Sequence, residues 1–585
     1  MKQSQEKRNI KRSNLLEFFA VLAIVVFANL IGHYLFARLD LTAEHRYTLS
    51  KSTKKMLKQI DEPVLFRVYL EGDDIPAEYK RLQNETREML NQFRAFNKFI
   101  EYEFVDVSPS SFDSQEECQV FYQKLAQAGI QPASVQMQTK NGVTQQILIP
   151  AATVYYRGSE TSIQLMQGQQ YVSEEEAMNN SIQDLEYVLS NVIRNLANTQ
   201  KKHIGFLLGH GELERGAVYD IQMSLLSNYA LENVYLDKNI NALTGRNRSA
   251  KDSSMYFYNK FDVLVVAKPT QAFTDQELYL LDQYVMYGGH VLWLIDPLAA
   301  DLDSLATNNQ MVAVRFPVNL DEMLFTYGVR VNPDIIMDIR CRPIPMAVGQ
   351  VGDKPQIKFC PWFYFPEIVP ISNHPIVRNL DLIKTDFVSS IDLIDNDIVK
   401  TVLLQSSEYA RVKNAPAIID LNDGKVEPDR RLFNRSNLPV AVLLEGNFKS
   451  MWRNRLAPSF TEIPEMGYKE VSEPTSMIVI SDGDMIKNRF NYNDNSAYPM
   501  GYDYYTHTMY ANKQFILNAI DYLAGNEEVL ATRTRDIKLR KLNAMSLKED
   551  RTLFQWINVI LPVILVIVGG LIYVFFRLRK VKGKR

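Results

Sequence analysis

The chain has 585 residues, too many for one ordinary domain, and this length predicts roughly three or four domains. Apolar residues make up 46% and charged residues 23%, proportions that fit globular protein and exclude a disordered chain. The net charge of -3 provides no overall basic field, so we do not expect nucleic acid to be a partner.

The N-terminus predicts a membrane anchor. Residues 1–14 form a basic tail, and residues 15–37 are apolar and long enough to span a hydrocarbon core of about 30 Å. A cleaved signal peptide is the alternative. It would have a shorter apolar core followed by an A-x-A site, and no such site follows. We therefore favour an uncleaved transmembrane helix.

Residues 42–172 predict a small α/β domain. Ser50 is suited to cap a helix over 51–59, and further helices are expected over 78–99 and 121–128. Strands are expected at 63–72, 102–109, 145–150 and 152–156. This order of elements is thioredoxin-like. The cysteine pair of a redox thioredoxin is absent, so redox activity is not expected.

Residues 173–200 predict a connecting helix, opened by a capping box of Ser173 and Glu176. Residues 201–530 predict the larger domain. Residues 203–212 are expected to be a short apolar strand that runs into a glycine loop, with further strands at 261–269, 290–297 and 476–484. The helices of this domain are expected at 220–229, 274–287, 320–327 and 512–523. Continuous apolar strands that alternate with helices favour a parallel sheet covered on both faces.

The C-terminus predicts a second anchor. Residues 531–553 are a basic juxtamembrane segment, 554–576 a transmembrane helix, and 577–585 a basic tail. Basic residues flank the outer ends of both helices, so the positive-inside rule places both termini in the cytoplasm and residues 40–552 outside it. The basic segment 531–553 could contact anionic lipid or a partner, or it could be a solvated surface.

Three cysteines occur, Cys118, Cys341 and Cys360, and none forms a C-x-x-C pair, which excludes a zinc ribbon. Cys341 and Cys360 are the nearest pair, but we favour reduced, buried thiols over a disulfide.

Candidate binding residues follow three of the predicted parallel strands. Ligands of open parallel sheets bind beyond the carboxyl ends of the strands. The polar residues at these ends are His210, Glu212, Asp296, Asp482 and Asp484. The alternative is that the neighbouring glycines make tight turns while the acids cap helices and loops.

Catalytic motifs are lacking. There is no G-x-S-x-G elbow for a nucleophile and no G-x-x-x-x-G-K-[ST] loop for nucleotide phosphates. A metal site from Asp482, Asp484 and Asp503 is conceivable, but such spacing is common by chance. We expect no catalytic residue, no metal and no cofactor. The tyrosine-rich segment 491–510 could contact sugars or a protein partner, or it could be a structural loop.

Several segments in order resemble one family. They are RYTLSKSTKKML (46–57), FLLGHGE (206–212), PVAVLLEGNFKSMW (439–452), ISDGDMIKN (480–488), NKQFILNAIDYLAGNE (512–527) and IKLRKL (537–542). Together they resemble the gliding-motility-associated ABC-transporter auxiliary, or substrate-binding, family (GldG). The resemblance implies a partner permease and a separate cytoplasmic ATPase in a bacterial inner membrane. It also implies a glutamine-amidotransferase-like fold, here without the nucleophile.

We therefore predict a non-enzymatic, membrane-anchored auxiliary subunit of an ABC transporter. Two helices are too few to line a transport path, and no ATP-binding motif is present, so partners must supply both functions. Two alternatives stay open: an extracytoplasmic hydrolase that uses the acidic loop ends, and a scaffold protein of the cell envelope.

Overall fold

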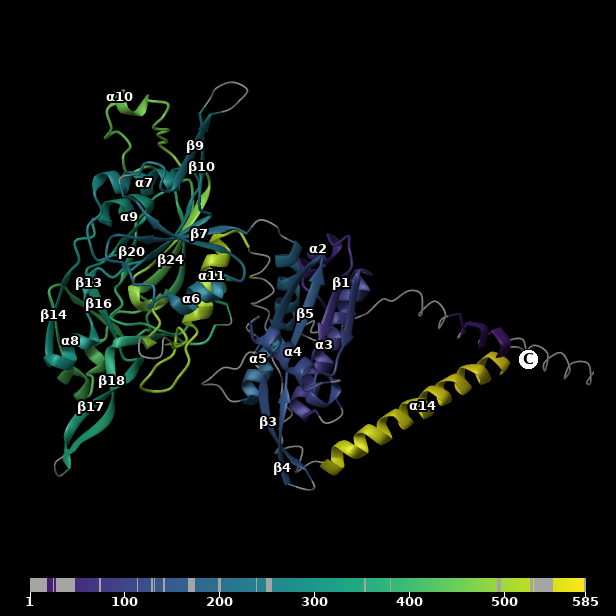
Figure 1. Cartoon of the computed structure of the whole chain (residues 1–585). Coiled ribbons are helices and arrows are strands. Elements are labelled where there is room, and N and C mark those ends of the chain that lie inside the picture. The colour runs from purple at the N-terminus through teal and green to yellow at the C-terminus, as the bar shows by residue number, and fades with distance from the viewer. Residues whose placement is uncertain are drawn as a thin grey trace, which may run out of the picture. The chain divides into compact units, whose positions relative to one another are not determined.

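The computed structural model describes residues 18–20, 22–24, 26–27, 48–530 and 551–582 (Figure 1). Within 48–530, short breaks fall at 73–74, 113, 128–129, 131, 140–141, 167–173, 198–200, 238, 249–254, 352–353, 379, 492–495 and 527–529. The chain divides into two units, one of Tyr47–Asp536 and one of Met1–Arg46 with Ile537–Arg585. Ser173 of the predicted capping box and most of the basic segment 531–553 lie outside the described residues.

One described helix is long and apolar enough to cross a membrane. Helix α14 (Arg551–Lys582) contains the stretch Trp556–Phe576, whose mean hydropathy is 2.9. This stretch is compatible with the predicted C-terminal anchor. The predicted first span, 15–37, lies mostly outside the described residues, although 18–20, 22–24 and 26–27 are helical. The first span therefore stays a prediction.

The small α/β region is built on a four-stranded sheet in the order β2-β1-β5-β6. β1 (Val64–Val68) pairs parallel with β2 (Ile100–Phe104) and antiparallel with β5 (Ala151–Tyr156), which pairs antiparallel with β6 (Ser159–Gln164). Its helices are α2 (Lys51–Lys58), α3 (Ala77–Phe96) and α4 (Gln115–Gln127), and β3 (Ala133–Thr139) and β4 (Gly142–Leu148) form a separate hairpin. The side chain of Ser50 accepts from the Thr53 amide, which confirms the predicted cap.

Helix α5 (Glu174–Ala197) contributes to this region as well as leading to the next one. Its apolar face, which includes Leu185, Leu189 and Ile193, joins the core cluster that contains β1 and α3. The prediction missed β3 and β6, and it began α4 six residues late, because the first turn of α4 carries acids instead of apolar residues.

The larger region contains a seven-stranded sheet in the order β21-β24-β25-β12-β11-β7-β8. Five strands are parallel: β25 (Thr475–Ile480), β12 (His290–Leu294), β11 (Val263–Ala267), β7 (His203–Leu208) and β8 (Ala230–Tyr235). β24 (Pro439–Gly446) and β21 (Val399–Gln405) extend the sheet antiparallel at one side, so the predicted all-parallel sheet is a mixed one.

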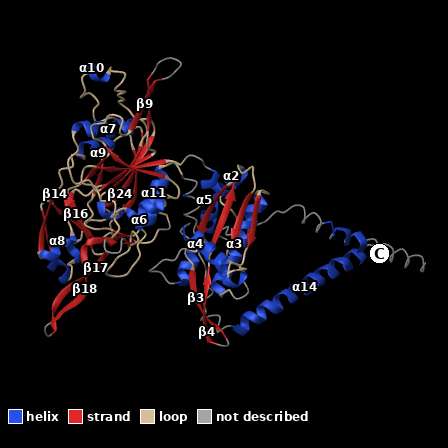
Figure 2. Cartoon of the chain, in the orientation of Figure 1, coloured by secondary structure: helices blue, strands red, loops and turns tan. Residues whose placement is uncertain are grey.

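Both faces of this sheet are buried, as predicted. Val263 and Val265 of β11 belong to one core cluster, and Leu264 and Val266 belong to the other, because successive side chains on a strand point to opposite faces. The first face is covered by α6 (Tyr219–Leu225) and α11 (Asn512–Leu523), and the second by α7 (Asp275–Met286) and α9 (Asp321–Tyr327) (Figure 2). Helix α7 begins at a capping box of Thr274 and Glu277.

A further set of strands, together with α8 (Leu302–Thr307), lies between β12 and β24 in the chain and was not predicted. Most of these strands share a core cluster around Trp362 and Tyr364, whereas Val329, Ile383 and Ile391 belong to the clusters of the seven-stranded sheet. The strands are β13 (Leu298–Ala299), β14 (Gln310–Arg315), β15 (Val329–Val331), β16 (Asp334–Asp338), β17 (Cys341–Val351), β18 (Lys354–Ile368), β19 (Ile383–Lys384), β20 (Ile391–Leu393), β22 (Ala410–Asn414) and β23 (Ala417–Asp420). Smaller elements are β9 (Thr244–Arg248), β10 (Met255–Asn259), α10 (Pro458–Thr461), β26 (Phe490–Asn491) and β27 (Ser496–Ala497).

The three cysteines are free thiols, as favoured from the sequence; Cys118 and Cys360 are also buried as expected, whereas Cys341 is half-buried. Cys341 and Cys360 lie on the paired strands β17 and β18 but are not register partners, since Cys341 lies opposite Pro366 and Cys360 opposite Ile344. Burial raises the pKa of Cys341 to about 12, so this thiol is protonated at neutral pH.

Candidate functional site

Two of the predicted acids, Asp296 and Asp484, meet around a lysine that was not predicted, and a third, Asp482, is adjacent in the same loop. β12 lies between β25 and β11, so the loops that follow these three strands are adjacent. The Lys268 amine lies 3.0 Å from Asp296 Oδ2 and 2.5 Å from Asp484 Oδ2, and all three side chains are largely buried. The backbone N–H of Gly483 donates to Asp296 Oδ1 at 2.5 Å. We call Lys268, Asp296, Asp482 and Asp484 the lysine cluster.

Glycine is required at position 483 because a Cβ atom there would lie 2.7 Å from the Lys268 side chain. Lys268 itself has a positive φ of 56°, a conformation that is uncommon for a residue other than glycine. No sequence pattern pointed to Lys268, since a single lysine after an apolar strand is most often a solvated residue.

The carboxyls of the lysine cluster differ in charge state. Burial raises the pKa of Asp296 to about 6, although Lys268 opposes the rise. Burial and the neighbouring carboxylates raise the pKa of Asp482 well above its ordinary value, which favours the protonated acid. Burial also acts on Asp484, but Lys268 and Lys487 outweigh it and lower its pKa. These carboxyls are therefore neutralised within the protein, by a proton or by an amine.

Asp482 also has a structural role. Its Oδ1 accepts from the Asp484 backbone N–H at 2.9 Å, which caps the short 3-10 helix Gly483–Ile486. Its Oδ2 accepts from the Asp386 backbone N–H at 2.9 Å. These contacts agree with the alternative that the sequence left open for Asp482, in which the acid caps a helix or loop and does not bind a ligand.

The other two predicted residues form a separate group at the end of β7. His210 Nδ1 lies 3.4 Å from Glu212 Oε1, and His210 Nε2 lies 3.3 Å from Glu277 Oε2 at the start of α7. The imidazole stacks on the Phe273 ring with 3.9 Å between centroids. Gly211, in the tight turn between His210 and Glu212, has a φ of 73°. The five predicted residues therefore lie in two groups, and no ion pair joins these groups within the described part of the chain.

His210 should make stability depend on pH. Burial alone would lower its pKa, but Glu212 and Glu277 outweigh burial and raise it. A raised pKa in the folded state gives stability that is present below the unfolded value and is lost as pH rises through the folded value. We expect His210→Gln to lose most stability near about pH 6 and least near about pH 9, measured by denaturant unfolding.

His203→Gln is the matched control, because His203 is an exposed imidazole at the other end of the same strand. His203→Gln should cost little stability, because a substitution at an exposed position usually changes it by less than about 0.5 kcal/mol. A pH-independent loss in His210→Gln would show that only the stacking of the ring matters.

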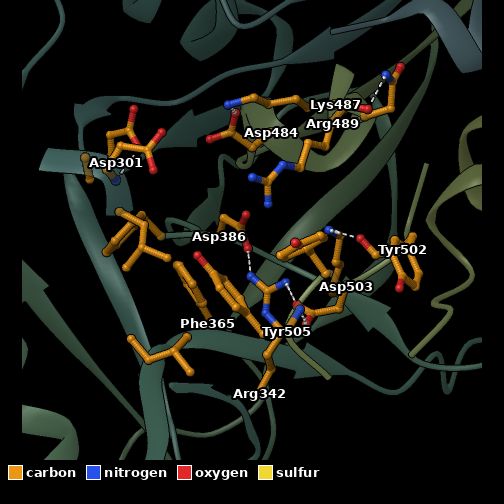
Figure 3. A pocket seen from close by; sticks show the side chains of 18 of the residues that line it. Asp301, Arg342, Phe365, Asp386, Asp484, Lys487, Arg489, Tyr502, Asp503 and Tyr505 are labelled. Carbon is orange, nitrogen blue, oxygen red and sulfur yellow. Dashed lines mark hydrogen bonds and ion pairs between the residues drawn. The ribbon is translucent and has the colours of Figure 1, made fainter. Parts of the chain in front are cut away.

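A polar cavity of about 290 Å³ adjoins the lysine cluster, and Asp484 belongs to both (Figure 3). Of its other polar lining residues, Asp503 was considered only as a conceivable metal ligand, and the rest were not predicted: Asp301, Asp303, Arg342, Lys384, Asp386, Lys487, Asn488 and Arg489. Tyr502, Tyr504 and Tyr505 of the tyrosine-rich segment complete the wall, so that segment was the available signal in the sequence. Tyr492 lies outside the described residues.

The floor of the cavity contains a buried arginine. The side chain of Arg342 is 5% exposed and lies 2.7 Å from Asp503 Oδ2, and its other terminal nitrogen pairs with Asp386. The guanidinium lies 4.4 Å from the centroid of the Phe365 ring. Burial acts to raise the pKa of Asp503, but Arg342 reverses this and lowers it. Two carboxylates therefore balance this cation and fix its orientation.

A metal site from Asp482, Asp484 and Asp503 does not fit these contacts. Asp484 is paired with Lys268, Asp503 with Arg342, and protonation of Asp482 is favoured. Within the described residues, no group of three or more His, Cys, Asp or Glu side chains has metal-binding geometry.

Two protein families, one relative and one solved structure are similar to parts of this chain. Residues 201–519 match the family described as an ABC-type uncharacterized transport system, and 43–155 match a domain of unknown function (DUF7088). An uncharacterized protein of Borreliella burgdorferi (strain ATCC 35210 / DSM 4680 / CIP 102532 / B31) is 20% identical over 560 residues, covering 91% of this chain and 92% of that protein. The solved mmIFT52 N-terminal domain aligns at 13% identity over 55% of this chain and 97% of its own, with a TM-score of only 0.29.

The first of these matches spans more than half of the 585 residues, including the seven-stranded sheet, the lysine cluster and the cavity. The chain therefore belongs to the ABC-type uncharacterized transport system family, as an auxiliary component of such a transporter.

Proposed function

We propose that the chain is a non-enzymatic, membrane-anchored auxiliary subunit of an ABC transporter, which acts with a separate permease and a cytoplasmic ATPase. The family match over residues 201–519 is the observation that carries this proposal. The apolar stretch Trp556–Phe576 supports attachment to a membrane. The resemblance to the gliding-motility-associated family extends the proposal to a bacterial inner membrane and to cell movement.

The proposed topology has two spans, 15–37 and 554–576, with both termini in the cytoplasm and the large soluble region on the periplasmic side. Basic residues at the outer flanks of both segments support it. Within the soluble region, the strand order β2-β1-β5-β6 supports a thioredoxin-like small domain over 42–172. The five parallel strands support an amidotransferase-like larger domain over 201–530.

The chemistry at the sheet edge favours a binding role over hydrolysis. A hydrolytic acid and base must be free to exchange protons with a substrate. Here Asp296 and Asp484 are engaged by Lys268, and Asp482 accepts two backbone hydrogen bonds. We therefore propose that the soluble region binds a ligand or partner at the adjoining cavity without transforming it.

Co-purification tests the transporter role. We expect the full chain, extracted in mild detergent, to recover a permease and an ATPase in fixed proportion. A variant in which 554–576 is replaced by a polyleucine helix of equal length should remain in the membrane but recover less permease, because specific helix packing is lost while apolarity is retained.

A clean monomer from the native membrane would contradict the proposal. If the polyleucine variant recovers as much permease as the full chain does, then the permease contacts a part of the chain other than this helix. Protease added to spheroplasts should cleave the soluble region, and a protected soluble region would contradict the periplasmic topology.

A further inference from the structure

The floor of the cavity presents fixed polar groups with little net charge. Arg342 is balanced by Asp386 and Asp503. Its Nε atom is buried and has no hydrogen-bond partner among the described residues. Lys384 donates to the Tyr502 carbonyl at 3.2 Å. A floor of this kind offers donors and acceptors in set directions, which suits the hydroxyl groups of a ligand better than a high ligand charge.

One wall is aromatic. Tyr504 and Tyr505 are 45% and 39% exposed, so their rings are available to a ligand. Tyr502 is held in place, because its hydroxyl lies 2.6 Å from His507 Nδ1 and its ring stacks on Tyr498 at 5.7 Å. Tyrosine combines an apolar face with a polar edge. A sugar ring has the same two features, an apolar C–H face and a hydroxylated edge.

Among the described residues, Arg489 lines the cavity without a carboxylate partner. Arg489 is exposed, and its guanidinium lies 4.3 Å from the centroid of the Tyr504 ring. Figure 3 shows this guanidinium reaching into the cavity, between Asp484 and Asp386. A planar guanidinium with free donors matches a carboxylate in bidentate geometry.

The wall opposite Tyr502 and Asp503 carries acidic residues. Asp301 caps α8 by accepting from the Asp303 backbone N–H, and both side chains line the cavity (Figure 3). Carboxylates accept hydrogen bonds from hydroxyl groups, but they repel a second anionic group. This asymmetry favours a ligand with one acidic end and one hydroxylated end.

We infer that the cavity binds a small acidic saccharide, with its carboxylate on Arg489, its ring against Tyr504 and Tyr505, and its hydroxyl groups on the acids and the paired arginine. The cavity volume of about 290 Å³ is at the lower limit for small-molecule sites, which span roughly 300–1,000 Å³. This inference names the ligand class for the proposed binding role and rests on it.

Calorimetric titration of the full chain in detergent tests the inference, with D-glucuronate, D-glucose and inorganic phosphate as probes. We expect glucuronate to bind about tenfold more tightly than glucose, because a charge-assisted hydrogen bond is lost with the carboxylate. Arg489→Gln should remove this preference, because an uncharged amide cannot form the charge-assisted pair with a carboxylate. Arg431→Gln is the matched control, since Arg431 is an exposed arginine of the same region that pairs with Asp429 and does not line the cavity.

Equal binding of glucuronate and glucose, or no effect of Arg489→Gln, would overturn the inference. Phosphate that binds as tightly as glucuronate would also overturn it, because an anion site without sugar recognition would then suffice. If none of the three probes binds while the permease and ATPase still co-purify, the inferred saccharide binding is wrong, but the proposed transporter role is not affected.

Discussion

Replacing Lys268 by methionine is expected to destabilise the soluble region by about 3–5 kcal/mol at neutral pH. The substitution leaves Asp296 and Asp484 close together and buried without the amine that neutralises them. Removing one partner of a buried ion pair costs this much because the remaining charge stays uncompensated. Urea unfolding of the full chain in detergent, followed by the fluorescence of the buried Trp293 and Trp362, measures the loss.

The cost of Lys268→Met should increase with pH. In the native protein the pKa of Asp296 is about 6, whereas its ordinary value is 3.8. A carboxyl with a raised folded pKa contributes stability below pH 3.8 and loses this contribution as pH rises through about 6. Without Lys268 the folded pKa should rise further, and the loss should extend to higher pH. We therefore expect a smaller cost near pH 5 than near pH 8.

Lys449→Met is the control, because Lys449 pairs with Asp397 at 2.8 Å but both side chains are at least half exposed. Surface pairs contribute little, so only a small change that varies little with pH is expected. A pH-independent loss in Lys268→Met would indicate that the lysine acts through its alkyl chain alone.

Four of the five parallel strands could be predicted because their signals are local, whereas the edge strand β8, ALENVY, is largely exposed and was missed. The runs HIGFLL, VLVVA, HVLWL and TSMIVI are short, apolar and followed by polar loop residues. The rule that ligands meet the carboxyl ends of such strands then directed attention to Asp296, Asp482 and Asp484. Helix α11 was predicted with its observed bounds, since its apolar residues recur at helical spacing.

The rest of the site depends on contacts between distant residues. Lys268 reaches Asp484 across 216 positions, and Arg342 reaches Asp503 across 161. Arg342 also lies in β17, whose pairing with β18 includes five prolines and two register shifts and gives no regular alternation of apolar residues. A prediction based on periodicity could not place such a strand or the cation on it.

The second large effect is expected at Arg342. Arg342→Met should cost about 3–5 kcal/mol at neutral pH, because Asp503 is almost fully buried and would lose the cation that lowers its pKa. A carboxyl with a lowered folded pKa contributes stability above its unfolded value and loses it as pH falls. The native contribution of Asp503 should therefore shrink as pH falls below 3.8, and the cost of Arg342→Met should be smallest at the lowest pH at which the chain stays folded.

A combined variant separates the loss of charge balance from the loss of packing. In Arg342→Met with Asp386→Asn and Asp503→Asn, no charged group of the triad remains. The amide that replaces the Asp503 carboxylate keeps an oxygen that can accept from the Tyr505 and Thr506 backbone N–H groups, as the carboxylate does. We expect this variant to regain most of the stability lost in Arg342→Met, since neutral replacement of a whole buried ion pair is often tolerated. If it remains as unstable as the single variant, then the contact between Arg342 and the Phe365 ring, instead of the ion pairs, holds the floor of the cavity together.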